Sequence, residues 1–226
     1  MPESKEDQML KLSGEFQQMV DEFFRIQCRY QAGIREVQTK LEILDDEFQM
    51  RHQRNPIHHM TSRMKTIQSM MEKLKRKQMP VSMSSAVENL TDIAGIRVIC
   101  NYIDDIYTIA NLLASQDDIR VIKWHDYIKE PKPNGYRSLH LVVQVPVFLS
   151  DGPTPVPVEV QIRTIAMDFW ASLEHSLHYK NVDAISADIT DELTRTAEDI
   201  ARLDERMQRI QQRVEALHPA ENQLKL

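Results

Sequence analysis

Cysteine is scarce in this chain, which has 226 residues and only two cysteines, Cys28 and Cys100. Both lie within apolar patterns, and their separation excludes the paired spacing that protein zinc sites use. The near absence of cysteine fits a reducing compartment, where disulfides do not persist. We expect both cysteines to be inert residues of the core.

Long apolar runs and an excess of positive charge are also missing. No stretch approaches the length needed to span a bilayer, and residues 1–7 lack the apolar segment of a signal peptide. We therefore expect a cytoplasmic protein with no membrane partner. The chain has 28 Lys and Arg residues and 34 Asp and Glu residues, which gives a formal net charge of −6. The whole chain is thus no basic nucleic-acid binder, and local clusters of cations must meet any anionic ligand.

Helical patterns occupy both ends of the chain. Apolar residues recur at helical spacing over residues 8–50, which predicts one or two amphipathic helices with Gly33 as the weak point. A shorter helix is predicted over residues 62–77, and a further one over residues 164–179. With 42% hydrophobic residues, the chain can form a full core in one domain with extensions, or at most two domains.

The central part alternates between strand and helix patterns. Short apolar runs, some of them strictly alternating, predict strands, and a helical pattern follows the first of them. The strands cover residues 94–101, 120–124, 139–147 and 157–163, the helix covers residues 103–116, and turn-rich loops cover residues 129–135 and 150–155. This alternation predicts an α/β (α+β) fold, with a mixed sheet of about five strands surrounded by helices.

A last helix begins near Asp188, and its apolar positions follow the alternating four-three spacing of a heptad seam. The seam comprises Ile189, Leu193, Thr196, Ile200, Leu203, Met207, Ile210, Val214 and Leu217. Such a seam either packs on the protein's own core or forms a subunit interface. We favour the interface, because the helix is long, terminal and highly charged on its other faces.

Two strand-like segments each carry one carboxylate in an apolar run. Asp92 stands in one, and in the other, residues 156–163, alternation places Glu159, Gln161 and Arg163 on one face. A polar face on a half-solvated strand is common, so a purely structural role stays open for each segment alone. If the two carboxylates converge to about 4 Å, they repel by roughly 1 to 4 kcal/mol, and a divalent cation would turn that penalty into a binding site.

Basic residues gather along the predicted helix of residues 62–77, where Arg63, Lys65, Lys73 and Arg76 stand. They do not share one narrow stripe of a helix, yet they can surround a polyphosphate that lies along or across it. Arg forks and Lys ammonium groups are the usual partners of phosphate oxygens. The alternative is a solvated helix face.

The loop at residues 129–140 is more unusual. Two prolines limit its flexibility, and Gly135 permits a positive φ angle. Tyr136 follows at once, placed like a stacking platform for a planar ligand. The alternative is a tyrosine that caps the core at the entrance to a strand.

Three motifs, in this order, resemble those of the synthetase domain of the RelA/SpoT alarmone family. They are LTDIAGIR at residues 90–97, NGYRSLH at 134–140 and VEVQIRT at 158–164, followed by FWASLEH at 169–175. The resemblance covers roughly residues 43–180 and implies a nucleotidyltransferase-like synthetase fold. The small total length and the missing hydrolase and regulatory regions are similar to the stand-alone small alarmone synthetases, most closely to the RelQ type.

Carried over residue by residue, the resemblance implies two nucleotide sites around a metal ion. Asp92 and Glu159 would hold Mg²⁺, and Glu159 would also help to deprotonate the attacking hydroxyl. The residues implied for ATP are Arg63 and Arg97, which would sandwich the adenine, and Lys65, Lys73 and Arg76, which would bind the phosphates. Those implied for GDP or GTP are Tyr136, which would stack on guanine, Lys132 and His140 near its phosphates, and Gln161 beside Glu159.

The implied activity is the Mg²⁺-dependent transfer of the β,γ-pyrophosphate of ATP to the ribose 3′-hydroxyl of GDP or GTP, with AMP and ppGpp or pppGpp as products. The resemblance further implies a homotetramer, binding of single-stranded RNA, and an allosteric (p)ppGpp site whose region includes His58, His59 and Asp168. The rival hypothesis is a regulatory protein that binds nucleotides or RNA without catalysis. Intact carboxylates at both metal positions argue against it.

These patterns divide the chain into three parts. Residues 1–50 form an N-terminal helical segment, residues 51–180 the synthetase core, and residues 181–226 a C-terminal amphipathic helix for oligomerisation.

Overall fold

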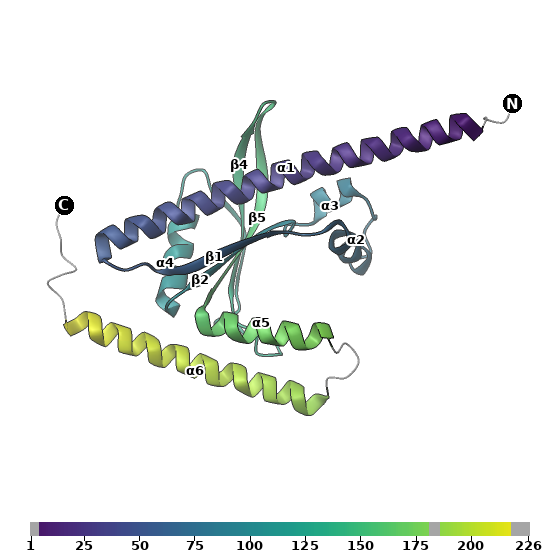
Figure 1. The fold of residues 1–226 in the computed structure, drawn as a ribbon. Coiled ribbons are helices and arrows are strands. Elements are labelled where there is room, and N and C mark those ends of the chain that lie inside the picture. The colour runs from purple at the N-terminus through teal and green to yellow at the C-terminus, as the bar shows by residue number, and fades with distance from the viewer. Residues whose placement is uncertain (1–4, 181–185, 218–226) are drawn as a thin grey trace.

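A mixed sheet of five strands lies at the centre of the protein, in the order β1-β2-β5-β4-β3 (Figure 1). In this computed structural model, which describes residues 5–180 and 186–217, β2 and β5 are parallel and the other neighbours are antiparallel. The strands are β1 (Ile57–Met64), β2 (Ala94–Cys100), β3 (Arg120–Asp126), β4 (Leu139–Leu149) and β5 (Gly152–Thr164). The predicted mixed sheet is thereby confirmed.

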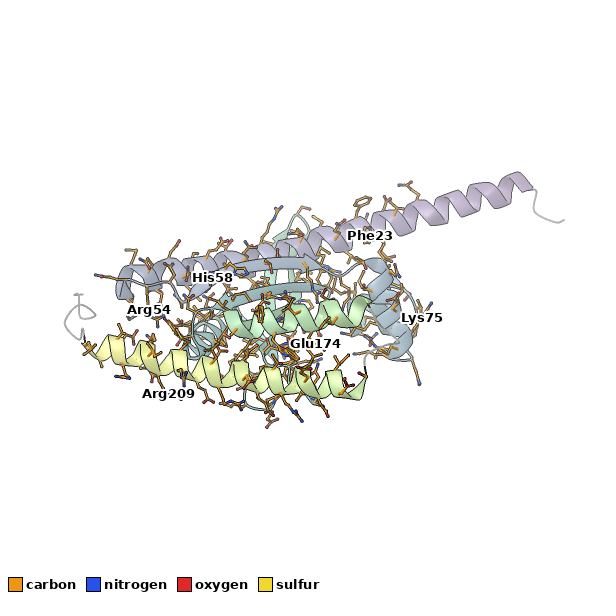
Figure 2. The ribbon with its side chains drawn as sticks, turned by 60° about the horizontal axis from the view of Figure 1, so that its bottom comes forward. Phe23, Arg54, His58, Lys75, Glu174 and Arg209 are labelled. Atoms are coloured by element: carbon orange, nitrogen blue, oxygen red, sulfur yellow. The ribbon has the colours of Figure 1, made fainter. Side chains whose placement is uncertain are left out.

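Helices cover both faces of the sheet, which confirms the predicted α+β class. α1 and α4 contact each other and pack on one face, whereas α5 lies between the other face and α6 (Figures 1 and 2). The helices are α1 (Lys5–His52), α2 (Ile67–Arg76), α3 (Met83–Asn89), α4 (Ile103–Ala114), α5 (Ile165–Lys180) and α6 (Ala187–Leu217).

Alternation along β5 decides which face of the sheet is core. Val156, Val158, Val160 and Ile162 are at most 1% exposed and belong to the hydrophobic core. Burying each such side chain stabilises the fold by about 1.5 to 3 kcal/mol. Glu159 alternates with these residues and is only half-buried. The face that is not core is therefore free to carry polar chemistry, as the sequence predicts.

α1 is one continuous helix of 48 residues, so Gly33 is not a weak point. A Cβ atom at Gly33 would lie 2.6 Å from Cγ1 of Val156. The missing side chain therefore lets α1 approach β5 closely. The N-terminal part of the helix continues beyond the sheet (Figure 1).

The helix predicted over residues 62–77 is wrong in its first part. Residues up to Met64 belong to β1, which pairs with β2 along its length. The hydroxyl of Thr66 then caps α2, which begins at Ile67. The side chains of β1 are mostly exposed and show no strand alternation, so only pairing with β2 reveals the strand. α3 is likewise an element that the sequence pattern does not predict.

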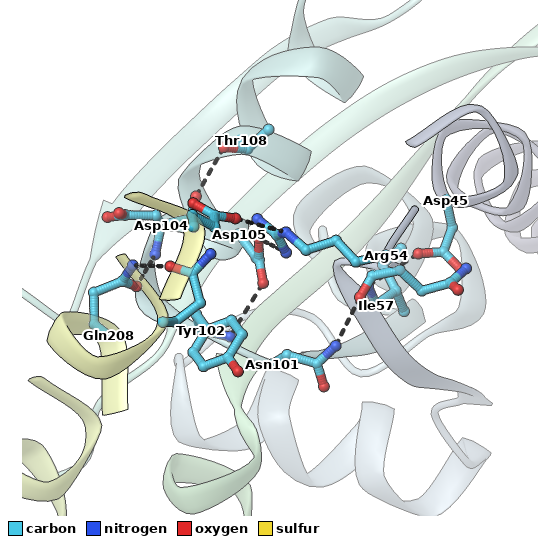
Figure 3. A network of polar contacts seen from close by, with 12 residues as sticks. Asp45, Arg54, Ile57, Asn101, Tyr102, Asp104, Asp105, Thr108 and Gln208 are labelled. Carbon is cyan, nitrogen blue, oxygen red and sulfur yellow. Dashed lines mark hydrogen bonds and ion pairs between the residues drawn. The ribbon is translucent and has the colours of Figure 1, made fainter. Parts of the chain in front are cut away.

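A polar network joins the start of β1 to α1, α4 and α6 (Figure 3). Nη1 of Arg54 donates to Oδ1 of the buried Asp105 at 2.8 Å, and the backbone N–H of Tyr102 donates to its Oδ2 at 3.2 Å. Oδ1 of Asp45 accepts from the N–H of Ile57 at 3.0 Å. Oε1 of Gln208 accepts from the backbone N–H of Asp104, the second residue of α4, at 3.0 Å. The network holds α6 against the rest of the fold.

Part of the heptad seam of α6 faces outward, whereas Leu193 and Ile200 of the same seam pack against the buried residues Trp170, Ala171 and Ala197. Leu203, Met207, Ile210 and Val214 are 43–52% exposed, whereas a different face, with Ala197, Asp204 and Gln208, is buried. The outward residues line a groove of about 960 Å³. For these positions the seam does not pack on the protein's own core.

The two cysteines differ in burial. Cys100 is buried as expected, but Cys28 is exposed on α1, so the expectation that it belongs to the core is wrong. Within the described ranges, none of the helices combines the length with the apolar character that crossing a bilayer requires. The expectation that residues 1–7 lack a signal peptide concerns mostly residues 1–4, which lie outside the described residues. Residues 181–185 and 218–226 of the predicted C-terminal segment also lie outside the described residues.

Candidate active site

Four neighbouring strands bring polar residues to one region of the sheet. The register places Arg97 of β2 opposite Gln161 of β5, and Gln161 opposite His140 of β4. Arg63 of β1 and Glu159 of β5 share the same neighbour on β2. Pairing of the strands thus gathers residues that lie far apart in the sequence.

Two adjoining hollows lie over this region. The smaller, of about 100 Å³, lies at Gly95, whose missing side chain leaves space between Arg63 and Glu159. The larger, of about 500 Å³, shares three residues with the smaller one. The predicted site residues that line the larger hollow are Arg63, Arg97, Lys132, Tyr136, His140 and Gln161. Arg63 and Arg97 of the predicted ATP set therefore meet the predicted GDP or GTP set here.

Asp92 stands apart from these hollows, in a cluster with two lysines. Its Oδ2 accepts hydrogen bonds from Nζ of Lys65 and from Nζ of Lys73, the latter at 2.6 Å. Burial alone would raise the pKa of Asp92, but the two ammonium groups outweigh it, and the pKa is lowered. Its Oδ1 is buried and has no hydrogen-bond partner among the residues that the structure describes. One carboxylate oxygen is therefore neutralised and the other is available to a ligand.

Arg76, the remaining cation of the predicted ATP set, lies in the last turn of α2. Its side chain is exposed, and it lines neither hollow. The structure brings Lys65 and Lys73 together at Asp92, but it does not add Arg76 to that cluster.

Glu159 is held by its neighbours along and across the sheet. Its Oε2 accepts from Nε2 of Gln161 at 2.9 Å, and its Oε1 lies 3.8 Å from Nδ1 of His140. Burial, with the nearby charges of Lys132 and Arg163, lowers the pKa of His140 to about 3. The imidazole is therefore neutral at ordinary pH, and its contact with Glu159 is not an ion pair.

The two carboxylates lie on neighbouring segments but do not touch the same groups. Glu159 is in register with Gly95, and Asp92 precedes Gly95 by three residues, an offset of at most about 11 Å. Among the described residues, no group of three or more His, Cys, Asp or Glu side chains could hold a metal ion. Asp92 and Glu159 could therefore act together only through a ligand that both side chains contact.

Arg163 is a site residue that sequence reasoning missed. Its guanidinium is buried, lines the larger hollow, and donates to Oε1 of Gln161 at 3.0 Å. Nη1 of Arg163 and Nη1 of Arg97 lie 3.4 Å and 3.6 Å from Oδ1 of Asp168 on α5. Burial lowers the pKa of Arg163 from its usual value. The signal was its position on the same face as Glu159 and Gln161.

Tyr136 lies at the other side of the larger hollow. Its hydroxyl oxygen lies 2.8 Å from Nε2 of His140. Nζ of Lys132 lies 4.6 Å from the centre of its ring, and Cζ of Arg163 lies 5.6 Å from it. Burial raises the pKa of Tyr136. Cations at these distances from an aromatic ring are attracted to its π electrons, which fixes the ring beside the hollow.

The loop that carries Tyr136 is tied to α5. Nδ2 of Asn134 donates to Oε1 of Glu174 at 3.0 Å, while its Oδ1 accepts from the N–H of Tyr136 at 3.2 Å. Sequence reasoning also missed Asn134 and Glu174 as site residues, although both stand in the quoted motifs. Both line the larger hollow.

The part of the chain that is similar to known proteins includes this site. A family profile described as the region found in RelA / SpoT proteins matches residues 62–184, a range that includes every residue predicted for the metal and nucleotide sites. The chain is also 45% identical to the GTP pyrophosphokinase YwaC of Bacillus subtilis over 186 residues, 82% of this chain and 89% of that protein. The chain belongs to the RelA/SpoT family.

Other relatives support the same assignment to the RelA/SpoT family. The GTP pyrophosphokinase YjbM of Bacillus subtilis is 38% identical over 191 residues, 84% of this chain and 89% of that protein. The crystal structure of small alarmone synthetase 1 of Bacillus subtilis, bound to its product pppGpp, matches with a TM-score of 0.78 and 38% identity, over 85% of this chain and 97% of that one. The resemblance to small alarmone synthetases is confirmed, and the RelQ type stays a prediction.

Proposed function

We propose that this protein transfers the β,γ-pyrophosphate of ATP to the ribose 3′-hydroxyl of GDP or GTP, giving AMP and ppGpp or pppGpp. The observation that carries the proposal is the pair of adjoining hollows, which share Arg63, Arg97 and Gln161 and include Glu159 and Tyr136. The relatives YwaC and YjbM are GTP pyrophosphokinases. Such a transfer mainly requires that two nucleotides are positioned and their charge neutralised.

For the donor, we assign ATP to the side of the site formed by β1, β2 and α2. Arg63 and Arg97 come from adjacent strands and line both hollows, so their planar guanidinium groups can enclose the adenine. Lys65 and Lys73 supply the ammonium groups for its phosphates. The side chain of Arg76 is exposed, so we assign it only to the outer end of the triphosphate of ATP.

For the acceptor, we assign GDP or GTP to the side of the larger hollow that holds Tyr136. The ring of Tyr136 would stack on guanine, with Lys132 as the cation for the 5′ phosphates. His140 would contact those phosphates as a neutral hydrogen-bond donor, because its pKa is lowered to about 3.

Asp92 and Glu159 would hold Mg²⁺. The residues fit the ion, because Oδ1 of Asp92 is a buried carboxylate oxygen with no partner in the described part of the chain, and carboxylate oxygens are the ligands that Mg²⁺ prefers. When bound, the ion would neutralise phosphate charge as it develops. Lys65 and Lys73 would meanwhile stay on Oδ2 of Asp92 and fix its orientation.

Glu159 would also accept the proton of the attacking 3′-hydroxyl. The hydrogen bond from Gln161 to Oε2 fixes the orientation of the carboxylate, and a neutral imidazole beside Oε1 does not compete for its charge. A general base needs this combination of a fixed position and a free lone pair.

The purified protein, incubated with labelled ATP and GDP with and without Mg²⁺, tests the proposal. We expect equal amounts of AMP and a guanosine nucleotide that carries a 3′ pyrophosphate, and only when the metal is present. A protein that binds both nucleotides without forming AMP would instead support the rival, non-catalytic regulatory role.

For assembly, we propose that the α6 groove receives a second copy of the chain, within a homotetramer. The exposed apolar residues of the heptad seam support this, because large apolar patches on soluble proteins mark interaction sites. The division into residues 1–50, 51–180 and 181–226 then corresponds to helix, core and assembly helix. α1 nevertheless shares the core of the sheet.

From the family resemblance we further propose a cytoplasmic location, an allosteric (p)ppGpp site and binding of single-stranded RNA. Of the regional candidates for the allosteric site, Asp168 pairs with Arg97 and Arg163 in the active site. The Nδ1 atoms of His58 and His59 lie 2.8 Å apart at the start of β1. Titration of pppGpp into the synthesis assay tests the activation, and an unchanged rate removes it.

A further inference from the structure

The loop of Tyr136 rests on the C-terminal helix. Gly135 has a φ angle of +85°, and a Cβ atom there would lie 2.6 Å from Cβ of Ala197 on α6 and 3.5 Å from Cα of Thr194. A contact this close leaves no room between the loop backbone and the helix. Ala197 itself is only 3% exposed.

Tyr136 belongs to the same packed cluster. Trp170 and Ala171 of α5 are buried with Ala197, and Tyr136, Leu193 and other partly buried residues pack against them. The side chain that would stack on guanine is therefore backed by a helix that lies outside the sheet. A packed cluster of this kind transmits any change of side-chain volume to its members.

Hydrogen bonds hold the loop and the helix together. Nη1 of Arg137 donates to the carbonyl oxygens of Gly135 at 3.1 Å and Ala197 at 3.3 Å. Nε1 of Trp170 donates to the carbonyl oxygen of Leu193 at 3.0 Å. The bond from Arg137 to Ala197 joins the loop to α6, and the bond from Trp170 joins α5 to α6, so moving α6 away from either would break a hydrogen bond.

A second anchor fixes α6 to the end of β5. The hydroxyl of Thr164 donates to Oδ2 of the buried Asp204 at 2.6 Å and accepts from the N–H of Met167 at 3.1 Å. α6 is thus held both beside Tyr136 and next to the strand that carries Glu159. These contacts place α6 as a support behind the active site.

We infer that Ala197 is a positioning residue for the acceptor nucleotide, which rests on the proposed assignment of Tyr136 to guanine. Its small side chain sets how far the Gly135–Tyr136 backbone lies from α6, and hence where the ring of Tyr136 stands. Arg63 and Arg97, which we assign to ATP, come from β1 and β2 and lie outside this cluster. A larger residue at position 197 therefore weakens binding of GDP and leaves binding of ATP unchanged.

Steady-state kinetics of the full chain test this inference. We compare Ala197→Val with Ala197→Ser, which stays small, and with Glu198→Val, which adds the same side chain at the exposed neighbouring position. We expect Ala197→Val to raise the KM for GDP about tenfold, with the KM for ATP and kcat within about twofold of the parent. Ala197→Ser and Glu198→Val keep the parent values. Equal rises in both KM values, or no rise, overturn the inference.

Tyr136→Ala separates this inference from the acceptor assignment. If Tyr136→Ala raises the KM for GDP and Ala197→Val does not, the assignment stands and the supporting role of Ala197 is wrong. If neither variant raises it, the acceptor assignment itself is wrong. Should Ala197→Val fail to fold, Arg137→Met replaces it, because it removes the hydrogen bond to the carbonyl of Ala197. We expect about a threefold rise in the KM for GDP from that variant, and an unchanged KM would overturn the inference.

Discussion

The hydroxyl of Tyr136 and Nε2 of His140 lie 2.8 Å apart, within one hydrogen bond. The same imidazole lies 3.8 Å from Glu159 through its Nδ1 atom. It thus connects the aromatic ring assigned to the acceptor with the carboxylate assigned to proton transfer. Because burial and two nearby cations keep this ring neutral, it can do so without adding charge between the two nucleotides.

The pKa of His140 makes the stability of the fold depend on pH. The folded pKa of about 3 lies below the ordinary value of 6.5, so between these values the unfolded chain binds more protons than the folded one. The contribution of His140 is complete above pH 6.5 and is lost as the pH falls toward 3. We expect the free energy of unfolding, from urea titrations, to fall less steeply below pH 6.5 in His140→Gln than in the parent. Equal slopes would contradict the burial of a neutral imidazole.

Lys73 should matter for ATP and not for folding. Its ammonium is 2.6 Å from Oδ2 of Asp92 and is half-buried beside the proposed polyphosphate site. We expect Lys73→Met to raise the KM for ATP about tenfold, because one charged hydrogen bond is lost. The KM for GDP should rise less. Lys75→Met, on the exposed side of the same helix, is the matched control. Similar effects of the two variants would refute the placement of ATP phosphates here.

If the groove on α6 is a subunit interface, a charge placed in it should lower the molecular mass of the assembly. Met207 is 43% exposed and lies among the apolar residues of that groove. We expect Met207→Glu to shift the protein toward smaller species in light scattering after size exclusion, because an unpaired charge would be buried at the interface. Arg206→Glu, at the exposed neighbouring position, should leave the mass unchanged. An unchanged mass for Met207→Glu would exclude this face as the interface.

Arg54 is expected to be the most sensitive residue of the network in Figure 3. Its partner Asp105 is 1% exposed, and burial raises the pKa of that carboxyl although Arg54 opposes the shift. Removing the guanidinium leaves a buried acid without its cation. We expect Arg54→Met to lower the free energy of unfolding by about 3 kcal/mol. In the double variant with Asp105→Asn the loss should be smaller, and equal losses would show that the two residues do not act as a pair.

Sequence patterns predicted the strands that bury one face. β2 and β5 alternate or run apolar because α1 and α4 cover them, so Val158, Val160 and Ile162 carry a clear local signal. β1 carries none, since its side chains are mostly exposed and only its pairing with β2 defines it. The predicted loop at residues 150–155 is for the most part strand for a related reason, because its prolines and Gly152 pair with β4 in a hairpin.

Site residues could be predicted from the sequence where they stand in a recognisable motif. They could not be predicted where their role depends on a contact with a distant part of the chain. Glu159, Gln161 and Tyr136 stand in motifs, and the structure gathers them at adjoining hollows. The support of Tyr136 by Ala197 could not be predicted, because alanine carries no chemical signal and the contact joins segments far apart in the chain. The pairing of Asp92 with Lys65 and Lys73 also depends on tertiary structure.

The role of the two carboxylates is tested by measuring alarmone synthesis by Asp92→Asn and Glu159→Gln in the presence of Mg²⁺, ATP and GDP. Both substitutions keep the size of the side chain and remove its charge, so melting temperatures near that of the parent would show that the fold is intact. We expect that neither variant forms detectable AMP and ppGpp. A folded variant that makes the product at a near-normal rate would contradict the metal-dependent site proposed at these two carboxylates.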